Sequence, residues 1–149
     1  MKVVIVVPAF NESPVIYNVL KSIPKKIRGI SLVDVVVVND GSGDNTQSEV
    51  QRAGFPVINH AINRGLGAAI KTGIEYAKEK KADIMVTFDG DGQHEPSDIE
   101  KIILPIIQKK ADLVIGSRFK KSKNVPLDRF FLNWFANFIT LLLYGVVTT

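Results

Sequence analysis

Cysteine is absent from this chain of 149 residues. Without thiols the protein can form no disulfide bond, use no thiol nucleophile and bind no zinc through cysteine. Low-complexity tracts and internal repeats are lacking too. The first apolar run, residues 3–7, is too short for a signal peptide and is not followed by a small-residue cleavage site. We therefore expect that run to be the first strand of a cytosolic domain.

The composition is ordinary for one globular domain, with 46% hydrophobic and 23% charged residues. The formal net charge is +4, and the excess concentrates in one cluster opposed only by Asp128: Arg118, Lys120, Lys121, Lys123 and Arg129. This cluster is compatible with a solvated loop, and it also suits a phosphate-bearing substrate or an anionic membrane surface. Nucleic acid is not the expected partner, because the cluster lacks the regular interleaving of aromatic residues found in single-strand binders.

Short apolar runs alternate with segments of helical periodicity. The predicted strands cover residues 3–7, 32–38, 55–58, 84–88 and 113–115. Capping signals precede three of the predicted helices: Ser13 with Pro14, Asp44 before residues 45–53, and Ser97 with Glu100. One further helix has an apolar face made of Leu66, Ala69, Ile70, Gly73, Ile74 and Ala77. The alternation predicts an α/β fold, with a mostly parallel sheet and helices on both faces.

Polar residues follow each of the first four predicted strands. They are Pro8 to Glu12, Asn39 to Asp44, Asn63 to Gly67, and Asp89 to Gln93. The carboxyl ends of parallel strands share one edge of a sheet, so we expect these loops to form one crevice. Any one of them is compatible with a plain turn, since Asp, Asn and Gly are common turn residues. Four together favour a binding site.

The loop after the fourth strand has the composition of a metal site. Asp89, Asp91 and Gln93 offer two carboxylates and an amide on a Gly-containing turn. Oxygen donors of this kind suit a hard cation, Mg²⁺ or Mn²⁺, which usually takes one or two carboxylates and completes its shell with substrate phosphates. The pattern therefore predicts a metal-held diphosphate. His94 follows directly and is compatible with ligation or with a structural role, and we expect His60 to be structural.

Five motifs occur together in the chain: Val6-Val-Pro-Ala-Phe-Asn-Glu12, Asn39-Asp-Gly-Ser-x-Asp-x-Thr46, Asn63-x-Gly-Leu-Gly67, Asp89-x-Asp-Gly-Gln-His94 and Gly116-Ser-Arg-Phe119. Their order and spacing resemble the family 2 glycosyltransferases of the GT-A fold. The pattern is most similar to dolichyl-phosphate mannose synthases and related polyprenyl-phosphate hexose transferases. The resemblance runs from Val3 to about Arg129.

The resemblance implies roles for individual residues on the donor side. The loop that holds the nucleotide's ribose and base would comprise Pro8, Phe10, Asn11 and Glu12. Asp40 would contact the base, while Asn39 departs from the commoner Asp-Asp-Gly-Ser pattern by keeping the size of Asp and losing its charge. The metal and sugar-diphosphate site would comprise Asp89, Asp91 and Gln93.

The catalytic residues implied by the resemblance are Asp91, Arg118 and Arg129, with both arginines near the acceptor phosphate. The implied reaction moves a hexose from GDP-mannose or UDP-glucose to a dolichyl or polyprenyl phosphate, with inversion. Physical chemistry agrees with these roles. A metal neutralises charge on the leaving diphosphate, and the arginine fork pairs with phosphate oxygens. The acceptor phosphate is already anionic at pH 7 and needs little base help.

The final segment differs from the rest. We expect a donor-binding domain over residues 1–125 and an apolar helix over 126–149, the start of an acceptor region in a domain that is incomplete. Asn133, Asn137 and Thr140 would form a polar stripe, so this helix is compatible with lying in the membrane interface, with packing on the domain, or with spanning the bilayer. The expected location is the cytoplasm, peripheral on the cytoplasmic face of a membrane.

Two other hypotheses remain open, and a third is disfavoured. The acceptor is a sugar or a protein in one of them. In another, the chain is a truncated domain that binds a nucleotide sugar without turning it over. A phosphoacceptor signalling domain is disfavoured, because Gly116-Ser117-Arg118 stands where such a domain needs a lysine after its last strand.

Overall fold

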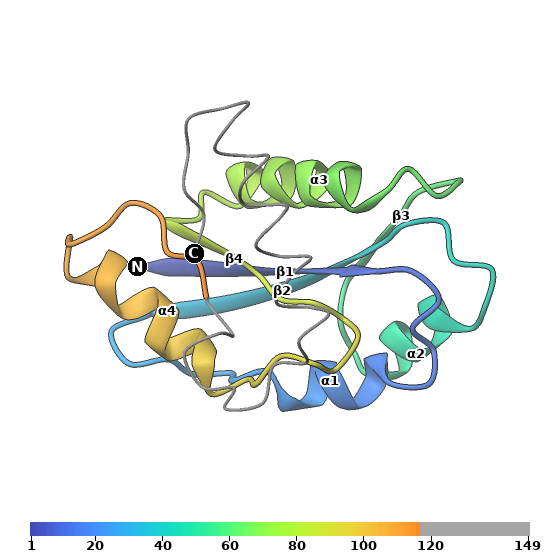
Figure 1. Cartoon of the computed structure of the whole chain (residues 1–149), viewed down its shortest axis with the longest axis horizontal. Helices are drawn as coiled ribbons and strands as arrows, with labels where there is room; N and C mark the ends of the chain where they lie inside the picture. Colours follow the sequence, from blue (N-terminus) through green and yellow to red (C-terminus); the bar gives the residue numbers. More distant parts are fainter. Residues whose placement is uncertain (117–149) are drawn as a thin grey trace, which may run out of the picture. The chain divides into compact units, whose positions relative to one another are not determined.

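The computed structural model describes residues 1–116 and has a parallel sheet with helices on both faces (Figure 1). The elements are β1 (Lys2–Ala9), α1 (Ile16–Ser22), β2 (Leu32–Asn39), α2 (Thr46–Arg52), β3 (Val57–Asn59), α3 (Leu66–Glu79), β4 (Ile84–Thr87) and α4 (Asp98–Ile107). All of them belong to one compact unit, Met1–Val114. The predicted α/β class with a mostly parallel sheet is confirmed.

The four strands lie in the order β3-β2-β1-β4, and every pairing is parallel. Ile5 of β1 lies opposite Val35 of β2 on one side and Val86 of β4 on the other. Residues 3–7 are fully buried, because β1 has a strand on each side and helices above and below. A strand covered on both faces reads as a continuous apolar run, and this is why its sequence shows no polar alternation.

Successive residues of β1 point to opposite faces and enter two separate cores. Val3, Ile5 and Val7 pack with residues of α1, α2 and α4. Val4 and Val6 pack with residues of α3. Figure 1 shows this division, with α3 alone on one face of the sheet and the other three helices on the opposite face.

The sheet-facing side of α3 is made of small residues: Ala69, Gly73 and Ala77 are its buried positions. A Cβ at Gly73 would overlap the side chain of Val6, so the helix backbone comes unusually close to the sheet. Two of the larger apolar residues predicted for this face of α3 are exposed instead of buried against the sheet. Leu66 is 59% exposed and Ile74 is 37% exposed.

The start of α1 differs from the prediction. The helix begins at Ile16, because the preceding turn closes on the Glu12 carbonyl, which accepts from the amides of Val15 (3.0 Å) and Ile16 (2.9 Å). Ser13 therefore does not cap it. α4 begins one residue after Ser97 as predicted, yet Ser97 makes no side-chain capping bond because its own backbone is already helical.

The predicted fifth strand, residues 113–115, is wrong for this structure. These residues form no strand, and Leu113 and Ile115 are 77% and 81% exposed. A three-residue apolar run contributes few ladder hydrogen bonds, and its pairing depends on tertiary neighbours that the run itself does not specify. The predicted boundary after residue 125 and the whole apolar segment lie outside the described residues.

Candidate functional site

The loops that follow the strands meet at the C-terminal edge of the sheet, and two glycines allow their close contact. A Cβ at Gly41 would overlap the backbone of Ile62 and Asn63, so the loop after β2 lies directly on the loop after β3. A Cβ at Gly90 would lie 3.1 Å from the carbonyl oxygen of Pro8, which brings the loop after β4 against the end of β1. The expected meeting of these loops at one edge is therefore seen among the described residues, and a crevice between them stays a prediction.

Side chains of the loop after β2 hold the backbone of the loop after β1. The amide of Asn11 donates to Ser42 Oγ (2.9 Å), and the amide of Glu12 donates to Thr46 Oγ1 (2.9 Å). In return the amide of Gly43 donates to Asn11 Oδ1 (2.9 Å). Asn11 has a φ of 56°, a left-handed conformation that Asn tolerates better than most residues. The two loops thus form one cross-braced unit.

Asp44 also contributes to the hydrogen bonds that join the loops after β1 and β2. Its carboxylate accepts from the amide and hydroxyl of Thr46 (3.0 and 2.5 Å) and from the amide of Ser13 (3.1 Å). Burial would raise the pKa of Asp44, but these hydrogen bonds outweigh it and lower the pKa to about 2. α2 has Asn45 as its N-cap residue, with no side-chain capping bond, so the predicted capping box at Asp44 is not formed; Asp44 instead bonds the amide of Thr46 from one residue further out, and its bond to Ser13 was not foreseen.

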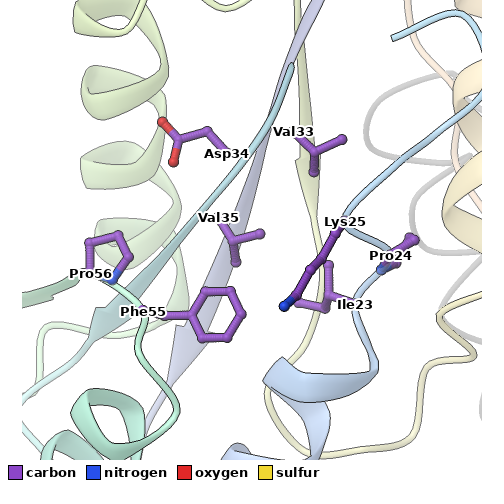
Figure 2. Close-up of a pocket in the computed structure, with 8 residues that line it drawn as sticks. All are labelled: Ile23, Pro24, Lys25, Val33, Asp34, Val35, Phe55 and Pro56. Carbon is purple, nitrogen blue, oxygen red and sulfur yellow. The ribbon is translucent and has the colours of Figure 1, made fainter. Parts of the chain in front are cut away.

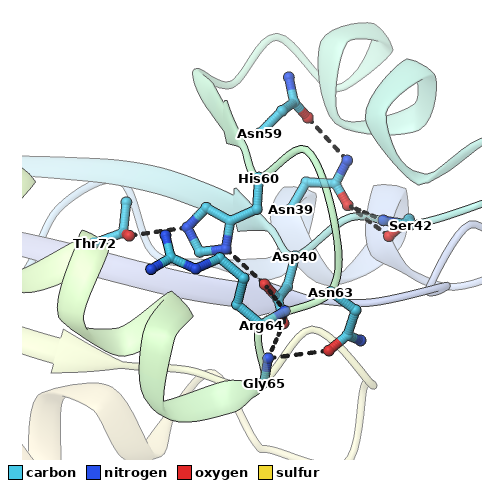
Figure 3. A network of polar contacts seen from close by, with 9 residues as sticks. All are labelled: Asn39, Asp40, Ser42, Asn59, His60, Asn63, Arg64, Gly65 and Thr72. Carbon is cyan, nitrogen blue, oxygen red and sulfur yellow. Dashed lines mark hydrogen bonds and ion pairs between the residues drawn. The ribbon is translucent and has the colours of Figure 1, made fainter.

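Asp40 lies at the centre of a buried polar network (Figure 3). It is 4% exposed, and its two carboxylate oxygens contact three groups of the chain. These are His60 Nδ1 (2.6 Å), the amide of Arg64 (3.0 Å) and the amide of Gly65 (2.7 Å). Burial acts to raise the pKa of Asp40, yet the hydrogen bonds prevail and lower it. The carboxylate is thus almost fully buried and already engaged by groups of the chain, and base contact by Asp40 stays a prediction.

The same network accounts for the amide at position 39. Asn39 Nδ2 donates to Asn59 Oδ1 (2.8 Å), while Asn39 Oδ1 accepts from Ser42 Oγ (2.5 Å). A carboxylate at 39 would have no proton for Asn59 and would bury a second negative charge beside Asp40. Asn39, which stands where the commoner motif has Asp, therefore suits its hydrogen bonds to Asn59 and Ser42.

The candidate metal loop carries two partly exposed carboxylates, Asp89 and Asp91. Asp89 Oδ2 pairs with His94 Nε2 at 3.0 Å, and Asp91 Oδ1 accepts from the amide of Gln93 (2.9 Å). Burial raises the pKa of Glu12, and the charges of Asp91 and Asp44 raise it further. The close approach of Gly90 to the Pro8 carbonyl brings the loop after β4 beside the loop after β1.

The donor set fits a divalent cation of the Mg²⁺ or Mn²⁺ type. Within residues 1–116, no three His, Asp or Glu side chains converge into a self-sufficient cage. A cation at Asp89 and Asp91 would therefore take further ligands from water or substrate phosphates, as these ions commonly do. Gln93 is exposed on the same loop, and its ligation stays a prediction. His94 stacks edge-on against Phe88 at 5.6 Å, which favours a structural role for it.

The remaining predicted residues divide into two groups. Phe10, 44% exposed, and the half-buried Pro8 lie at the end of β1, on the expected edge. Arg118 and Arg129 lie outside the described residues, so the structure does not place them relative to the crevice. The sequence analysis did not identify Ser42 or Thr46 as residues that hold the loop after β1, although a hydroxyl residue in the loop after β2, such as Ser42, is a usable signal for such bonds.

Two shallow hollows occur elsewhere on the unit. One, of about 310 Å³, lies where the end of α1, the first half of β2 and Phe55 meet (Figure 2). The other, of about 320 Å³, runs between α1 and residues 92–96 and has His94 in its wall. Only the second borders the candidate metal loop. In the part of the chain that the structure describes, no helix is long and apolar enough to cross a membrane.

Comparisons with known proteins agree with this geometry. The sequence profile of the family described as "Glycosyl transferase family 2" matches residues 4–145. The UDP-N-acetylglucosamine–dolichyl-phosphate N-acetylglucosaminyltransferase of Methanococcus voltae is 36% identical, with 97% of this chain and 64% of that protein covered. An uncharacterized protein of Methanocaldococcus jannaschii is 42% identical over 99% of this chain and 60% of its own length. The chain thus spans about 60% of the length of these relatives.

Solved structures identify the fold. The mannosyltransferase PcManGT of Pyrobaculum calidifontis, in complex with GDP-Man and Mn²⁺, has a TM-score of 0.58 at 26% identity, over 68% of this chain and 31% of that one. Glucosyl-3-phosphoglycerate synthase of Mycobacterium tuberculosis, with Mn²⁺ and UDP, also has a TM-score of 0.58, at 23% identity over 71% and 39% of the two chains. The sheet with its helices is the GT-A architecture of these glycosyltransferases.

Proposed function

The chain belongs to glycosyl transferase family 2, and we propose that it binds a nucleotide-diphosphate sugar and passes the sugar to a dolichyl or polyprenyl phosphate with inversion. The observation that carries this proposal is the convergence of three loops at one sheet edge. There, the loop that carries Asp89 and Asp91 packs at Gly90 against the end of β1, next to the braced loops after β1 and β2. An open α/β sheet binds its ligands at this edge.

The described residues have distinct tasks in this mechanism. Asp89 and Asp91 would hold a cation, which neutralises charge on the leaving diphosphate. The loop with Phe10 and Asn11 lies at the end of β1, where a nucleoside would rest against a rigid backbone. Its rigidity comes from Ser42 and Thr46, whose hydroxyls fix its amides before any ligand binds. Arg118 and Arg129 would orient the acceptor phosphate for in-line attack at the anomeric carbon.

The choice of donor and acceptor is part of the proposal. GDP-mannose and UDP-glucose are the expected donors, and the name of the Methanococcus voltae relative adds UDP-N-acetylglucosamine as a third to test. That relative acts on dolichyl phosphate by name, which supports a lipid phosphate acceptor. A peripheral position on the cytoplasmic face of a membrane would bring such an acceptor to the site.

Calorimetric titration tests the donor site. Each of the three nucleotide sugars is titrated into the chain with and without Mn²⁺, and then into Asp91→Asn. We expect one donor to bind in a metal-dependent manner, with affinity reduced at least ten-fold by Asp91→Asn. The matched control is Asp112→Asn, which alters an exposed carboxylate after α4 and should bind like the original chain. Absence of binding by a chain shown to be folded would contradict the proposal.

A transfer assay separates catalysis from binding. The chain is incubated with the donor that binds, Mn²⁺ and a short polyprenyl phosphate in detergent, and the lipid product is measured by mass. Glycosylated lipid supports the proposed reaction. Donor binding without any transfer would favour the binding-domain alternative, and transfer only to a sugar or protein would replace the lipid acceptor.

A further inference from the structure

His60 is a buried titratable residue that the proposed chemistry does not use. Its side chain is 6% exposed, and that of its partner Asp40 is 5% exposed. The ring contacts two groups: Nδ1 lies 2.6 Å from Asp40 Oδ1, and Nε2 lies 2.9 Å from Thr72 Oγ1 in α3. His60 therefore links the end of β2 to α3 through the residue that follows β3 (Figure 3).

Asp40 in turn holds the loop that leads into α3. The amides of Arg64 and Gly65 both donate to its carboxylate, at 3.0 and 2.7 Å. Amides just before a helix are a common anion-binding position. Here an internal carboxylate occupies it, so these two N–H groups are not available to a ligand's phosphate. The glycine-rich pattern of residues 63–67 reads like a phosphate cradle, but in this fold it serves to fix the loop.

The backbone of residues 61–67 is held by Asp40, and several side chains of this loop point toward solvent. Ile62 and Leu66 are 70% and 59% exposed, and Arg64 between them is exposed as well. The loop lies against Gly41, on the edge where the braced loops after β1 and β2 end. An exposed cation flanked by apolar side chains offers both charge and contact area to a nucleotide.

The position of the proton between His60 and Asp40 follows from which of their atoms can donate a hydrogen bond. An ionised Asp40 is an acceptor only, so Nδ1 of His60 must carry the proton that they share. In the neutral ring, Nε2 then accepts from the Thr72 hydroxyl. The two contacts, one on each ring nitrogen, hold the ring in one orientation between Asp40 and Thr72.

We propose that His60 is a positioning residue for the donor site: through Asp40 it fixes residues 61–67 as one wall of the nucleotide-sugar crevice. This inference rests on the proposed function for the identity of the ligand. It requires no contact between His60 and the ligand. Loss of the linkage should let the loop move, so that donor affinity falls because ordering the loop must then accompany binding.

Three variants dissect the linkage. His60→Ala removes both contacts. His60→Asn keeps a donor near the place of Nδ1, and Thr72→Val removes only the hydroxyl with little change in shape. We expect the donor dissociation constant to rise ten-fold or more in His60→Ala, about three-fold in Thr72→Val, and to recover to within about three-fold in His60→Asn. Val50→Ala is the control, because it truncates a buried core residue of α2 without touching the network.

Donor binding is measured by calorimetry at a temperature where urea titration shows every variant folded. A merely structural His60 would make His60→Ala resemble Val50→Ala, less stable but with unchanged donor affinity, and that result would overturn the inference. Failure of His60→Asn to recover affinity would also count against it. If the original chain bound no nucleotide sugar, the proposed function would fail first and this inference with it.

A second readout is independent of the ligand. Nitrogen-15 NMR of the histidine rings should show a protonated Nδ1 on His60, and the amides of Arg64 and Gly65 should exchange slowly with solvent. In His60→Ala both amides should exchange at least ten-fold faster, while those of α2 remain unchanged. An unprotonated Nδ1, or amides that exchange equally in both proteins, would contradict the linkage even if donor binding were intact.

Discussion

Replacing Gly41 with alanine tests whether the contact between the loops after β2 and β3 builds the site. Gly41 has a φ of +71°, and an added Cβ would overlap the backbone of Ile62 and Asn63. The left-handed conformation costs about 1–2 kcal/mol for alanine. Overpacking against backbone adds roughly 1–3 kcal/mol. The lower entropy of the unfolded chain offsets about 0.4–1 kcal/mol.

The sum predicts that Gly41→Ala lowers the free energy of unfolding by about 1–5 kcal/mol. With a urea dependence of about 2 kcal/mol per molar, the midpoint should fall by roughly 0.5–2.5 M. The alternative to losing stability is displacement of the 62–63 backbone. That displacement would stretch the bonds from Arg64 and Gly65 to Asp40, now 3.0 and 2.7 Å, so donor affinity should fall as well.

Gly43→Ala is the matched control in the same loop. Its φ lies outside the left-handed range, and nothing lies within 4 Å of its added Cβ. We expect its urea midpoint to equal or slightly exceed that of the original chain. Equal midpoints for the two variants would refute the reasoning, because they would show that the close approach at Gly41 does not constrain the loops.

Three further predictions concern other parts of the unit. Asp89→Asn should abolish the Mn²⁺ dependence of donor binding in calorimetry while leaving the urea midpoint nearly unchanged, and a large drop in that midpoint would contradict a functional role for this partly exposed residue. Asp44 has a pKa lowered to about 2, so its contribution to stability is present above about pH 4 and is lost as the pH falls toward 2. Urea titrations at several pH values should therefore show a weaker acid dependence in Asp44→Asn, and identical dependence would disprove the brace. Gly73→Ala should lower the free energy of unfolding by about 1–2 kcal/mol, because overpacking against Val6 outweighs the helix propensity gained. Thermal melting tests this prediction, and a melting temperature above that of the original chain would contradict it.

The sequence predicted the sheet well where the apolar runs were long. Residues 3–7 are all Val or Ile, residues 32–38 are apolar except for Asp34, and the structure makes these two runs the central strands β1 and β2. The run at 113–115 is also apolar, yet it forms no strand, whereas β3 pairs with β2 over only three residues, Val57–Asn59. The difference is therefore the neighbouring strand available for pairing, which the apolar run itself does not specify.

The candidate site was predictable in its location and less so in its internal contacts. The placement of four polar loops at one edge of the sheet follows from parallel topology alone, and Asp89 and Asp91 were predicted as metal ligands in this way. The sequence did not show which acidic residues of these loops hydrogen-bond to the chain and which remain exposed. Asp40 and Asp91 look alike in sequence as acids beside glycines, yet Asp40 is 4% exposed and holds amides of the chain, whereas Asp91 is partly exposed.

The amino-acid sequence by itself determined the α/β class, the sheet edge at which the four polar loops meet and the family to which the chain belongs. These follow from local patterns: hydrophobic period, turn residues and motif spacing. Only the tertiary structure decided that His60 is bonded to both Asp40 and Thr72, that Asn39 is paired with Asn59, and that α3 approaches the sheet at Gly73. Those contacts join residues far apart in the chain, and their partners are set by how the elements pack, which no local pattern records.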